Sequence, residues 1–212
     1  MCSLKLTFKS LSAALVLTSA ASHAAIVLNP SFEVDALAPG GFTGTSTNWT
    51  IAGGPGGTQH FSTQTPLATA GIQHAYANGG ASLSQLTSET IVAGQKYTLT
   101  VDVGRESTLS SSLATLRLFG STLGPGTAIA ELTGIAPGQG SYLLGNTFSY
   151  TALPSGDPFL GQTVGIALIG QSGGVQVLFD NVRFDVAAVP EPSSLLLGGL
   201  GALALLRRRR GM

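Results

Sequence analysis

Three side chains in the middle of the chain have the chemistry of a ligand-binding surface. Tyr76 follows His74 within one short run, His60 precedes Phe61, and Arg105 follows a strand-like segment. An aromatic face packs against the apolar face of a sugar ring, while imidazole and guanidinium groups hydrogen-bond with its hydroxyls. We therefore expect Tyr76, His60 and Arg105 to form a partly exposed ligand-binding surface. The alternative is that each of them has a structural role.

The residues offer little for catalysis. Cys2 is the only cysteine and lies in a segment that we expect to be removed, so the mature protein has no thiolate zinc site or catalytic thiol. His60 and His74 are too far apart in sequence for a paired-histidine metal motif. We therefore expect the protein not to be an enzyme and to have no catalytic residues. A secreted carbohydrate-active enzyme stays open as an alternative, because histidines and several acids are present.

Charge excludes one large class of partner. The 212 residues include 10 basic and 10 acidic side chains, so the formal net charge is zero. Between residues 25 and 190 there are four basic and nine acidic side chains, because the other basic residues cluster at both ends. A negatively charged body repels phosphate backbones. We expect no nucleic-acid partner.

The C-terminal segment has three parts in a fixed order. Pro190, Glu191 and Pro192 come first, an uncharged stretch follows from Ser193 to Leu206, and four arginines come last. A helix over this stretch would be roughly 21 Å long, short for a permanent membrane span. The arginines would stay on the cytoplasmic side. A tail anchor without a sorting enzyme is the alternative.

This tail resembles the PEP-CTERM sorting signal of Gram-negative bacteria that make extracellular polysaccharide. The resemblance implies that residues 189–212 are a sorting signal, with Pro190, Glu191 and Pro192 as the recognition motif of an exosortase. It also implies transient insertion of the hydrophobic transmembrane helix into the inner membrane, followed by removal of the tail and sorting to the cell surface or the extracellular matrix.

The N-terminal segment is typical of a secretory signal peptide. Two lysines precede an uncharged run from Leu11 to Ala21, and small residues follow it at Ser22 and Ala24. We predict a signal peptide over residues 1–24, with cleavage after Ala24. The body would then comprise residues 25–188 and be secreted.

The body is a series of short segments with alternating polar and apolar residues, separated by glycine, proline, asparagine and serine. In Lys96–Val103 one face carries four apolar side chains and the other carries Thr98, Thr100 and Asp102, which we expect to meet solvent. Such segments predict an all-β fold, an antiparallel β-sandwich. The predicted strands are Asn48–Ile51, Thr58–Ser62, Gln73–Ala77, Ser82–Leu86, Lys96–Val103, Leu113–Phe119, Asn146–Thr151, Thr163–Ile169 and Val175–Val186.

Five short segments of the body resemble the galactose-binding-like jelly roll of many carbohydrate-binding modules. They are Asn29–Glu33, Asn48–Thr50, Gly80–Gln85, Gly94–Thr100 and Phe179–Phe184. The resemblance implies an antiparallel jelly-roll β-sandwich with a tendency to bind sugars, and it implies that the matching tryptophan, Trp49, packs in the core. In that family the first and last strands often hold a structural calcium ion. This points to Glu33 and Asp180 as Ca²⁺ ligands, with turn hydrogen bonds as the alternative role of both acids.

Together these features predict an exported, surface-sorted, non-catalytic protein associated with extracellular polysaccharide or a biofilm matrix. Its expected partners are an exosortase and the polysaccharide. The alternative is a structural surface component without a sugar site.

Overall fold

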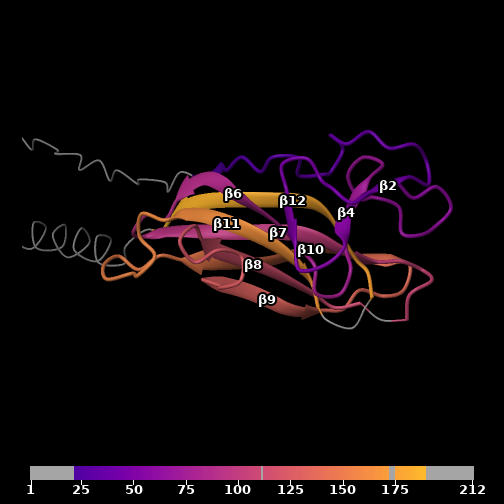
Figure 1. The fold of residues 1–212 in the computed structure, drawn as a ribbon. Coiled ribbons are helices and arrows are strands. Elements are labelled where there is room, and N and C mark those ends of the chain that lie inside the picture. The colour runs from indigo at the N-terminus through magenta and orange to yellow at the C-terminus, as the bar shows by residue number, and fades with distance from the viewer. Residues whose placement is uncertain (1–21, 111, 172–174, 190–212) are drawn as a thin grey trace, which may run out of the picture.

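The computed structural model describes residues 22–110, 112–171 and 175–189. In these residues the chain forms twelve strands and no helix, arranged as two antiparallel sheets in two layers (Figure 1). The prediction of an all-β, antiparallel jelly-roll sandwich is confirmed.

The larger sheet has seven strands. Its strand order is β10-β7-β12-β5-β4-β2, and β1 pairs with the free side of β12. The strands are β1 (Ser22–Ala24), β2 (Phe42–Thr43), β4 (Gly56–Gln59), β5 (His74–Ala77), β7 (Gln95–Arg105), β10 (Ser141–Thr151) and β12 (Val177–Ala188).

The smaller sheet closes the other side of the core. Its order is β3-β6-β11-β8-β9, made of β3 (Thr50–Ala52), β6 (Ser82–Thr90), β8 (Ala114–Gly120), β9 (Ala130–Ile135) and β11 (Thr163–Gly170). Each predicted strand falls on one of the strands of the two sheets, and only β1, β2 and β9 were not predicted. β2 is too short to show an alternation, and β9 lies exposed at the sheet edge with Gly134 inside it.

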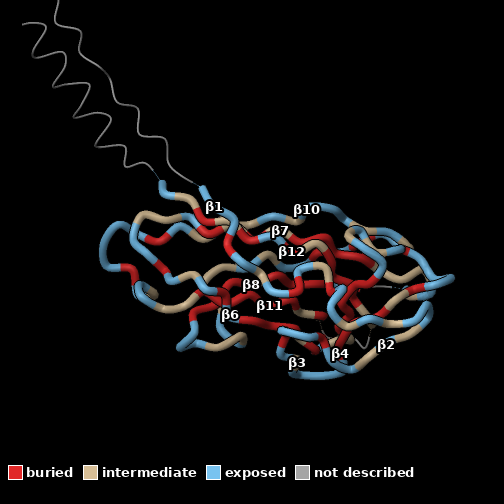
Figure 2. The backbone as a smooth tube through the Cα atoms, turned by 90° about the horizontal axis from the view of Figure 1, so that it is seen from above, coloured by how far each residue is buried: buried red, intermediate tan, exposed pale blue. Residues whose placement is uncertain are grey.

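Alternation in the sequence builds the core. Along β7 the side chains of Tyr97, Leu99, Val101 and Val103 are fully buried between the sheets, and Figure 2 shows buried backbone concentrated along the central strands. Trp49 also packs in this core, against Phe32.

A bulge adjusts the last strand. On β12 the register shifts between Asp180 and Arg183, and Asn181 takes a positive φ of 52°. The extra residue lets both Phe179 and Phe184 face the core while Asp180 stays on the outer face. This bulge therefore decides where the Asp180 carboxyl points.

Part of the outer face of the larger sheet is covered, although the sequence predicted that this face meets solvent. Asp102 is only 3% exposed, because the connection between β4 and β5, residues 60–73, crosses over it. We call this segment the strap. Thr69 of the strap donates hydrogen bonds to Asp102 and to Asp180, which lie on two adjacent strands. The polar face of β7 is therefore enclosed at Asp102, whereas Thr98 and Thr100 farther along the strand stay partly exposed, as expected.

The two ends of the described chain meet at one end of the sandwich, where Ser22 pairs with Ala187. Cleavage after Ala24, as predicted, would remove β1 and leave the Ala25 N–H donating to the Phe184 carbonyl, at 2.9 Å. Residues 1–21 of the predicted signal peptide, the sorting motif at Pro190, Glu191 and Pro192, and the predicted sorting helix lie outside the described residues. Among the residues described, no helix has the length and apolarity needed to cross a membrane.

Candidate functional site

Two carboxyl groups and an imidazole lie in one row beneath the strap. Asp180 of β12 is directly opposite Asp102 of β7. Phe179 pairs with Ala75, so the next position of the same register brings Asp180 beside His74 of β5. Three neighbouring strands thus contribute one titratable side chain each to a single patch, on the sheet face away from the core.

Asp180 is the most enclosed member of the row. Its side chain is fully buried, and its Oδ2 accepts hydrogen bonds from the Thr69 and Ala70 backbone N–H groups at 2.6 and 2.8 Å. Oδ1 accepts from the N–H of Asn181 at 2.7 Å. Burial raises the pKa of Asp180 to about 6, even though these hydrogen bonds act in the opposite direction. The carboxyl group is therefore poised to hold or release a proton near neutral pH.

Asp102 has a different set of partners. The Gly145 N–H donates to its Oδ1 at 2.7 Å and the Asn181 side-chain amide donates to its Oδ2 at 3.1 Å. Arg183 lies 3.8 Å from Oδ1 as an ion-pair partner. The two acids of the row are thus in unequal surroundings, because Asp180 has no cation paired with it among the described residues.

Aromatic and apolar side chains surround the row. Phe61 of the strap, Tyr76 of β5, Leu178 of β12 and Tyr142 of β10 form a small cluster on the outer face, separate from the main core. The Tyr142 ring can lie over the sheet only because residue 104 is glycine. A Cβ at that position would be 2.7 Å from the ring. The site therefore combines an acid with apolar walls.

His74 connects the row to these walls. Its ring is edge-on to Phe61, with centroids 4.6 Å apart, and the Gln59 amide nitrogen lies 3.2 Å from its Nε2. Burial, and secondly the charge of His60, lower the pKa of His74 to about 4. The imidazole is therefore neutral at physiological pH.

The arrangement can carry out acid catalysis. A carboxyl group with a pKa near the working pH is a general acid or base, and apolar walls keep water away from a reactive intermediate. Two carboxyl groups in unequal surroundings are a pattern found in proton-transfer sites.

Of the predicted ligand surface of Tyr76, His60 and Arg105, the structure contradicts the exposure of Tyr76, whereas the roles of His60 and Arg105 stay predictions. Tyr76 is 7% exposed, because Phe61 and Leu178 pack on it and its hydroxyl donates to the Thr43 carbonyl. Its prediction as an exposed platform is therefore wrong. His60 contacts the Leu37 carbonyl through Nδ1, and Arg105, the last residue of β7, donates to the carbonyl of Ser110 in the connection that follows.

Glu33 and Asp180 both bind the strap, at different points. Asp180 accepts from residues 69 and 70, whereas Glu33 Oε1 accepts from the N–H groups of Ile72 and Gln73 at 2.9 and 2.7 Å. Among the described residues no three His, Cys, Asp or Glu side chains are grouped as in a metal site. A cation shared by the two carboxylates would compete with these N–H donors, so this geometry does not fit a joint calcium site. Calcium binding stays a prediction.

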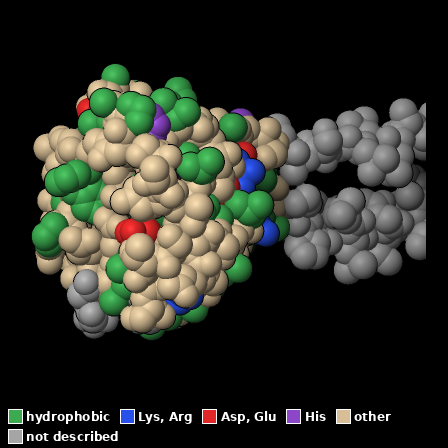
Figure 3. All heavy atoms as spheres, turned by 90° about the vertical axis from the view of Figure 1, so that its right-hand side faces the viewer, with side chains coloured by type: hydrophobic (Ala, Val, Ile, Leu, Met, Phe, Trp, Pro, Cys, Tyr) green, Lys and Arg blue, Asp and Glu red, His purple; other side chains and the backbone are tan. Residues whose placement is uncertain are grey.

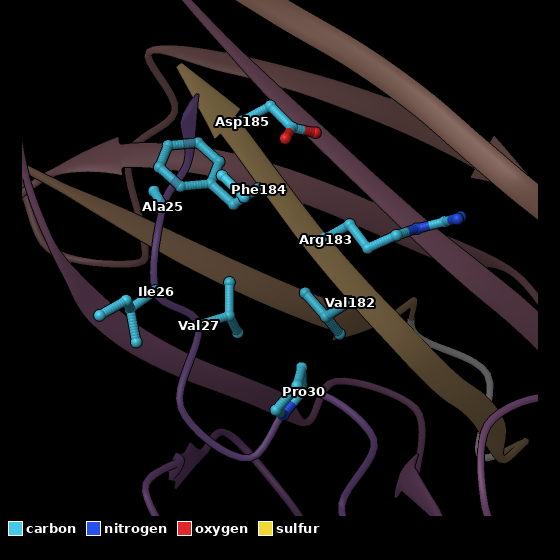
Figure 4. A pocket seen from close by; sticks show the side chains of 9 residues that line it. Ala25, Ile26, Val27, Pro30, Val182, Arg183, Phe184 and Asp185 are labelled. Carbon is cyan, nitrogen blue, oxygen red and sulfur yellow. The ribbon is translucent and has the colours of Figure 1, made fainter. Parts of the chain in front are cut away.

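Elsewhere in the described residues, one cavity and one end face show no comparable row of acids. A cavity of about 420 Å³ lies between residues 24–30 and β12. In Figure 4 its Arg183 and Asp185 side chains point away from the apolar group of Ile26, Val27 and Val182. The end face of the sandwich in Figure 3 shows scattered hydrophobic groups and few charged ones. We therefore place the candidate active site beneath the strap.

Two family models match the sequence. One, described as HpiC1 cyclase, matches residues 23–185, and the other, the PEP-CTERM protein-sorting motif, matches residues 188–210. The second match confirms the predicted sorting signal. It implies export, sorting to the surface and processing by an exosortase.

Several solved structures are similar to this chain. A cyclase from Fischerella sp. TAU is 22% identical, with a TM-score of 0.70 over 81% of this chain and 100% of its own. A cyclase from the same source, in complex with 4-(1H-indol-3-yl)butan-2-one, is 23% identical, with a TM-score of 0.69 over 80% of this chain and 100% of its own. The CBM22-1 xylan-binding domain from Paenibacillus barcinonensis is 13% identical, with a TM-score of 0.47 over 74% of this chain and 100% of its own. None of the curated proteins matches.

These findings correct one prediction. The expectation that the protein is not an enzyme is wrong, because the family model that covers the body describes a cyclase. Sequence reasoning also missed Asp102 and Tyr142 as members of a site. The alternation in Lys96–Val103 did place Asp102 on the outer face, but no sequence signal indicated that the strap would enclose that face.

Proposed function

Because the chain belongs to the HpiC1-like cyclase family, we propose that it is an exported acid catalyst that closes a ring in a largely apolar, unsaturated substrate. The observation that supports this most directly is Asp180. It is a fully buried carboxyl group beside an aromatic cluster, and burial raises its pKa to about 6. Such a group is protonated often enough near neutral pH to act as the acid.

In the proposed reaction Asp180 donates its proton to one carbon of a substrate double bond. The π electrons form the new C–H bond, and the neighbouring carbon becomes cationic. An aromatic ring of the substrate attacks that carbon, which forms the C–C bond that closes the ring. The aromatic ring then loses a proton to the Asp180 carboxylate. The acid is regenerated and the product is an isomer of the substrate, so the reaction consumes no oxidant or reductant.

The walls of the site favour an aromatic substrate. When the strap opens, Phe61, Tyr76 and Tyr142 can offer ring faces and edges to a planar ligand, and Leu178 adds aliphatic surface. The similar Fischerella cyclase binds an indole ketone. We therefore propose an indole or a comparable fused aromatic ring as the part of the substrate that the site binds.

Substrate entry requires the strap to move. Asp180 is fully buried under Thr69 and Ala70, and Glu33 holds the strap at Ile72 and Gln73. Opening breaks these hydrogen bonds, and the carboxyl group that they release is the proposed proton donor. Closure excludes water from the cationic intermediate.

Association with extracellular polysaccharide is a finer proposal. It is supported by the sorting motif, whose resemblance implies a destination at the surface or in the matrix. It has no support from Tyr76, which is buried. A structural surface role without a sugar site is the outcome if purified protein is not retained by the producing cell's polysaccharide.

The catalytic proposal is tested with 3-(3-methylbut-2-enyl)indole in D₂O. The full chain should convert this probe to an isomer that carries one carbon-bound deuterium in the new ring, detected by chromatography, mass spectrometry and NMR. Asp180→Asn should lower the rate on the order of 100-fold or more, as expected for loss of a general acid. Glu131→Gln, on β9 of the other sheet, is the matched control and should keep the rate. No isomer from the full chain, or equal rates for Asp180→Asn and the unmodified chain, would overturn the proposal.

A further inference from the structure

Two buried hydrogen-bond donors belong to neighbouring rings at the site. Within the part of the chain that the structure describes, neither the Tyr142 hydroxyl nor His74 Nδ1 has a hydrogen-bond partner, although both atoms are buried. The two rings lie with their centroids 6.3 Å apart, at 61°. A buried polar group without a partner destabilises the folded state. The Tyr142 hydroxyl and His74 Nδ1 could therefore both be satisfied by an acceptor that the described residues do not supply.

The hydrogen-bond network indicates that His74 Nδ1 is a donor. The amide nitrogen of Gln59 can only donate, so His74 Nε2 accepts from it and the ring proton is on Nδ1. In this orientation Gln59 also forms a reciprocal amide pair, in which its Oε1 accepts from Gln176 Nε2 at 3.2 Å and its Nε2 donates to Gln176 Oε1 at 3.5 Å. The tautomer of His74 thus follows from the orientation of the Gln59 amide.

Tyr142 also stays a donor. Burial, together with the charges of Asp180 and Asp102, raises the pKa of its hydroxyl well above the ordinary value. The phenol therefore keeps its proton at physiological pH. Arg105 Nε is a third buried atom without a partner in the described residues. The guanidinium of Arg105 donates to the Ser110 carbonyl in the connection after β7, and no contact joins it to Tyr142 or His74.

The surroundings select a neutral acceptor. His74 is uncharged because burial lowers its pKa to about 4, so it does not attract an anion. Asp102 and Asp180 lie on the same sheet face, and the Arg183 guanidinium near them is paired with Asp102. A carboxylate or phosphate would meet repulsion here, whereas a carbonyl or ether oxygen would not.

We propose that Tyr142 and His74 together bind a neutral hydrogen-bond acceptor of the substrate, such as a ketone or ether oxygen, and hold it beside Asp180. This inference rests on the proposed function, because it names the polar group that the cyclisation substrate carries. Asp180 supplies the proton, while the two donors set the position of the substrate relative to it.

The test compares two ligands that differ in one carbonyl group. Calorimetric titration of the full chain with 4-(1H-indol-3-yl)butan-2-one and with 3-butylindole should give at least about tenfold tighter binding of the ketone. Tyr142→Phe keeps the ring and removes the hydroxyl, so it should reduce this ratio severalfold. Tyr150→Phe is the control, because Tyr150 lies on the same strand but packs against the main core. That variant should keep the ratio.

The outcomes separate this inference from the catalytic proposal. Equal affinities for the two ligands, no measurable binding of the ketone, or an unchanged ratio in Tyr142→Phe would overturn the acceptor site, even if the prenylated probe is cyclised. The ratio should persist in Asp180→Asn, since that variant keeps both donors. A preserved ratio in a chain that does not cyclise the probe would leave the acceptor site standing and overturn only the acid catalysis.

Discussion

Asp102 and Asp180 lie directly opposite each other on β7 and β12, and the hydroxyl of Thr69 is 2.8 Å from one carboxyl group and 3.1 Å from the other. One hydroxyl group from the strap thus connects two acids of the sheet. Since the backbone of Thr69 also donates to Asp180, the strap contacts the proposed acid more extensively than its neighbour. A change in the charge of Asp180 should therefore change the strength of the hydrogen bonds that hold the strap.

Stability between pH 4 and pH 6.5 should depend on two opposite contributions. The pKa of Asp180 rises from 3.8 to about 6 on folding, so the native state binds more protons and the free energy of unfolding falls with pH, by up to about 3 kcal/mol. The pKa of His74 falls from 6.5 to about 4, so the unfolded state binds more protons and the free energy of unfolding rises by a similar amount. The two contributions nearly cancel in the unmodified chain.

Single variants should reveal both contributions. Denaturant unfolding at a series of pH values should show that the stability of Asp180→Asn, relative to the unmodified chain, increases from pH 4 to pH 6. His74→Gln should show the opposite trend. A pH-independent difference for Asp180→Asn would mean that Asp180 has an ordinary pKa, which would weaken its assignment as the acid.

Cyclisation of the prenylated probe should depend on pH through Asp180. The reaction needs the protonated carboxyl group, and burial raises the pKa of that group to about 6. The value of kcat/KM should therefore fall about tenfold per pH unit above that pH. Rates measured from pH 5 to pH 8 test this, and a rate that increases over the range would identify Asp180 as a base instead.

Replacement of Tyr76 should destabilise the fold. Tyr76 is 7% exposed and packs with Phe61 and Leu178, so Tyr76→Ala leaves a cavity beneath the strap and should cost about 3 kcal/mol. Thermal and denaturant unfolding measure the change. Tyr76→Phe is the control and should cost about 1 kcal/mol, through the hydrogen bond to Thr43. A stable Tyr76→Ala chain that loses polysaccharide retention would restore the sugar-platform prediction.

Calcium gives a separate prediction for Glu33 and Asp180. If both acids only bind backbone N–H groups of the strap, the melting temperature should be the same in calcium chloride and in EGTA. Glu33→Ala should then speed amide exchange at Ile72 and Gln73, which lose their acceptor. A melting temperature that rises with calcium and no longer does so in Asp180→Ala would instead establish the metal site.

The sorting motif predicts the mass of the mature protein. Protein isolated from the surface of a host with its exosortase should lack residues beyond about Pro192, since the match to the sorting motif covers residues 188–210. Intact-mass analysis checks this. Surface protein that still carries the four arginines would show that the tail is not processed.

Alternation and turn residues were enough to predict the layers of the fold. In Lys96–Val103, side chains two residues apart point to the same side of a strand, so Tyr97, Leu99 and Val101 could be assigned to the core from the sequence. The tail was equally readable, because sorting signals are linear and need no tertiary contacts. Both features depend only on residues that are near one another in the chain.

The site could not be predicted in this way, because it depends on contacts between distant segments. The sequence placed Asp102 on the polar face of its strand, but only folding brought Thr69 of the strap over it and Asp180 opposite it. For the same reason Tyr76, which reads as an exposed aromatic residue, is buried by Phe61. Burial also raises the pKa of Asp180. The sequence alone therefore determined the sandwich and the destination of this protein, whereas only the tertiary structure decided which of its acids is enclosed, since desolvation arises from the whole surrounding fold.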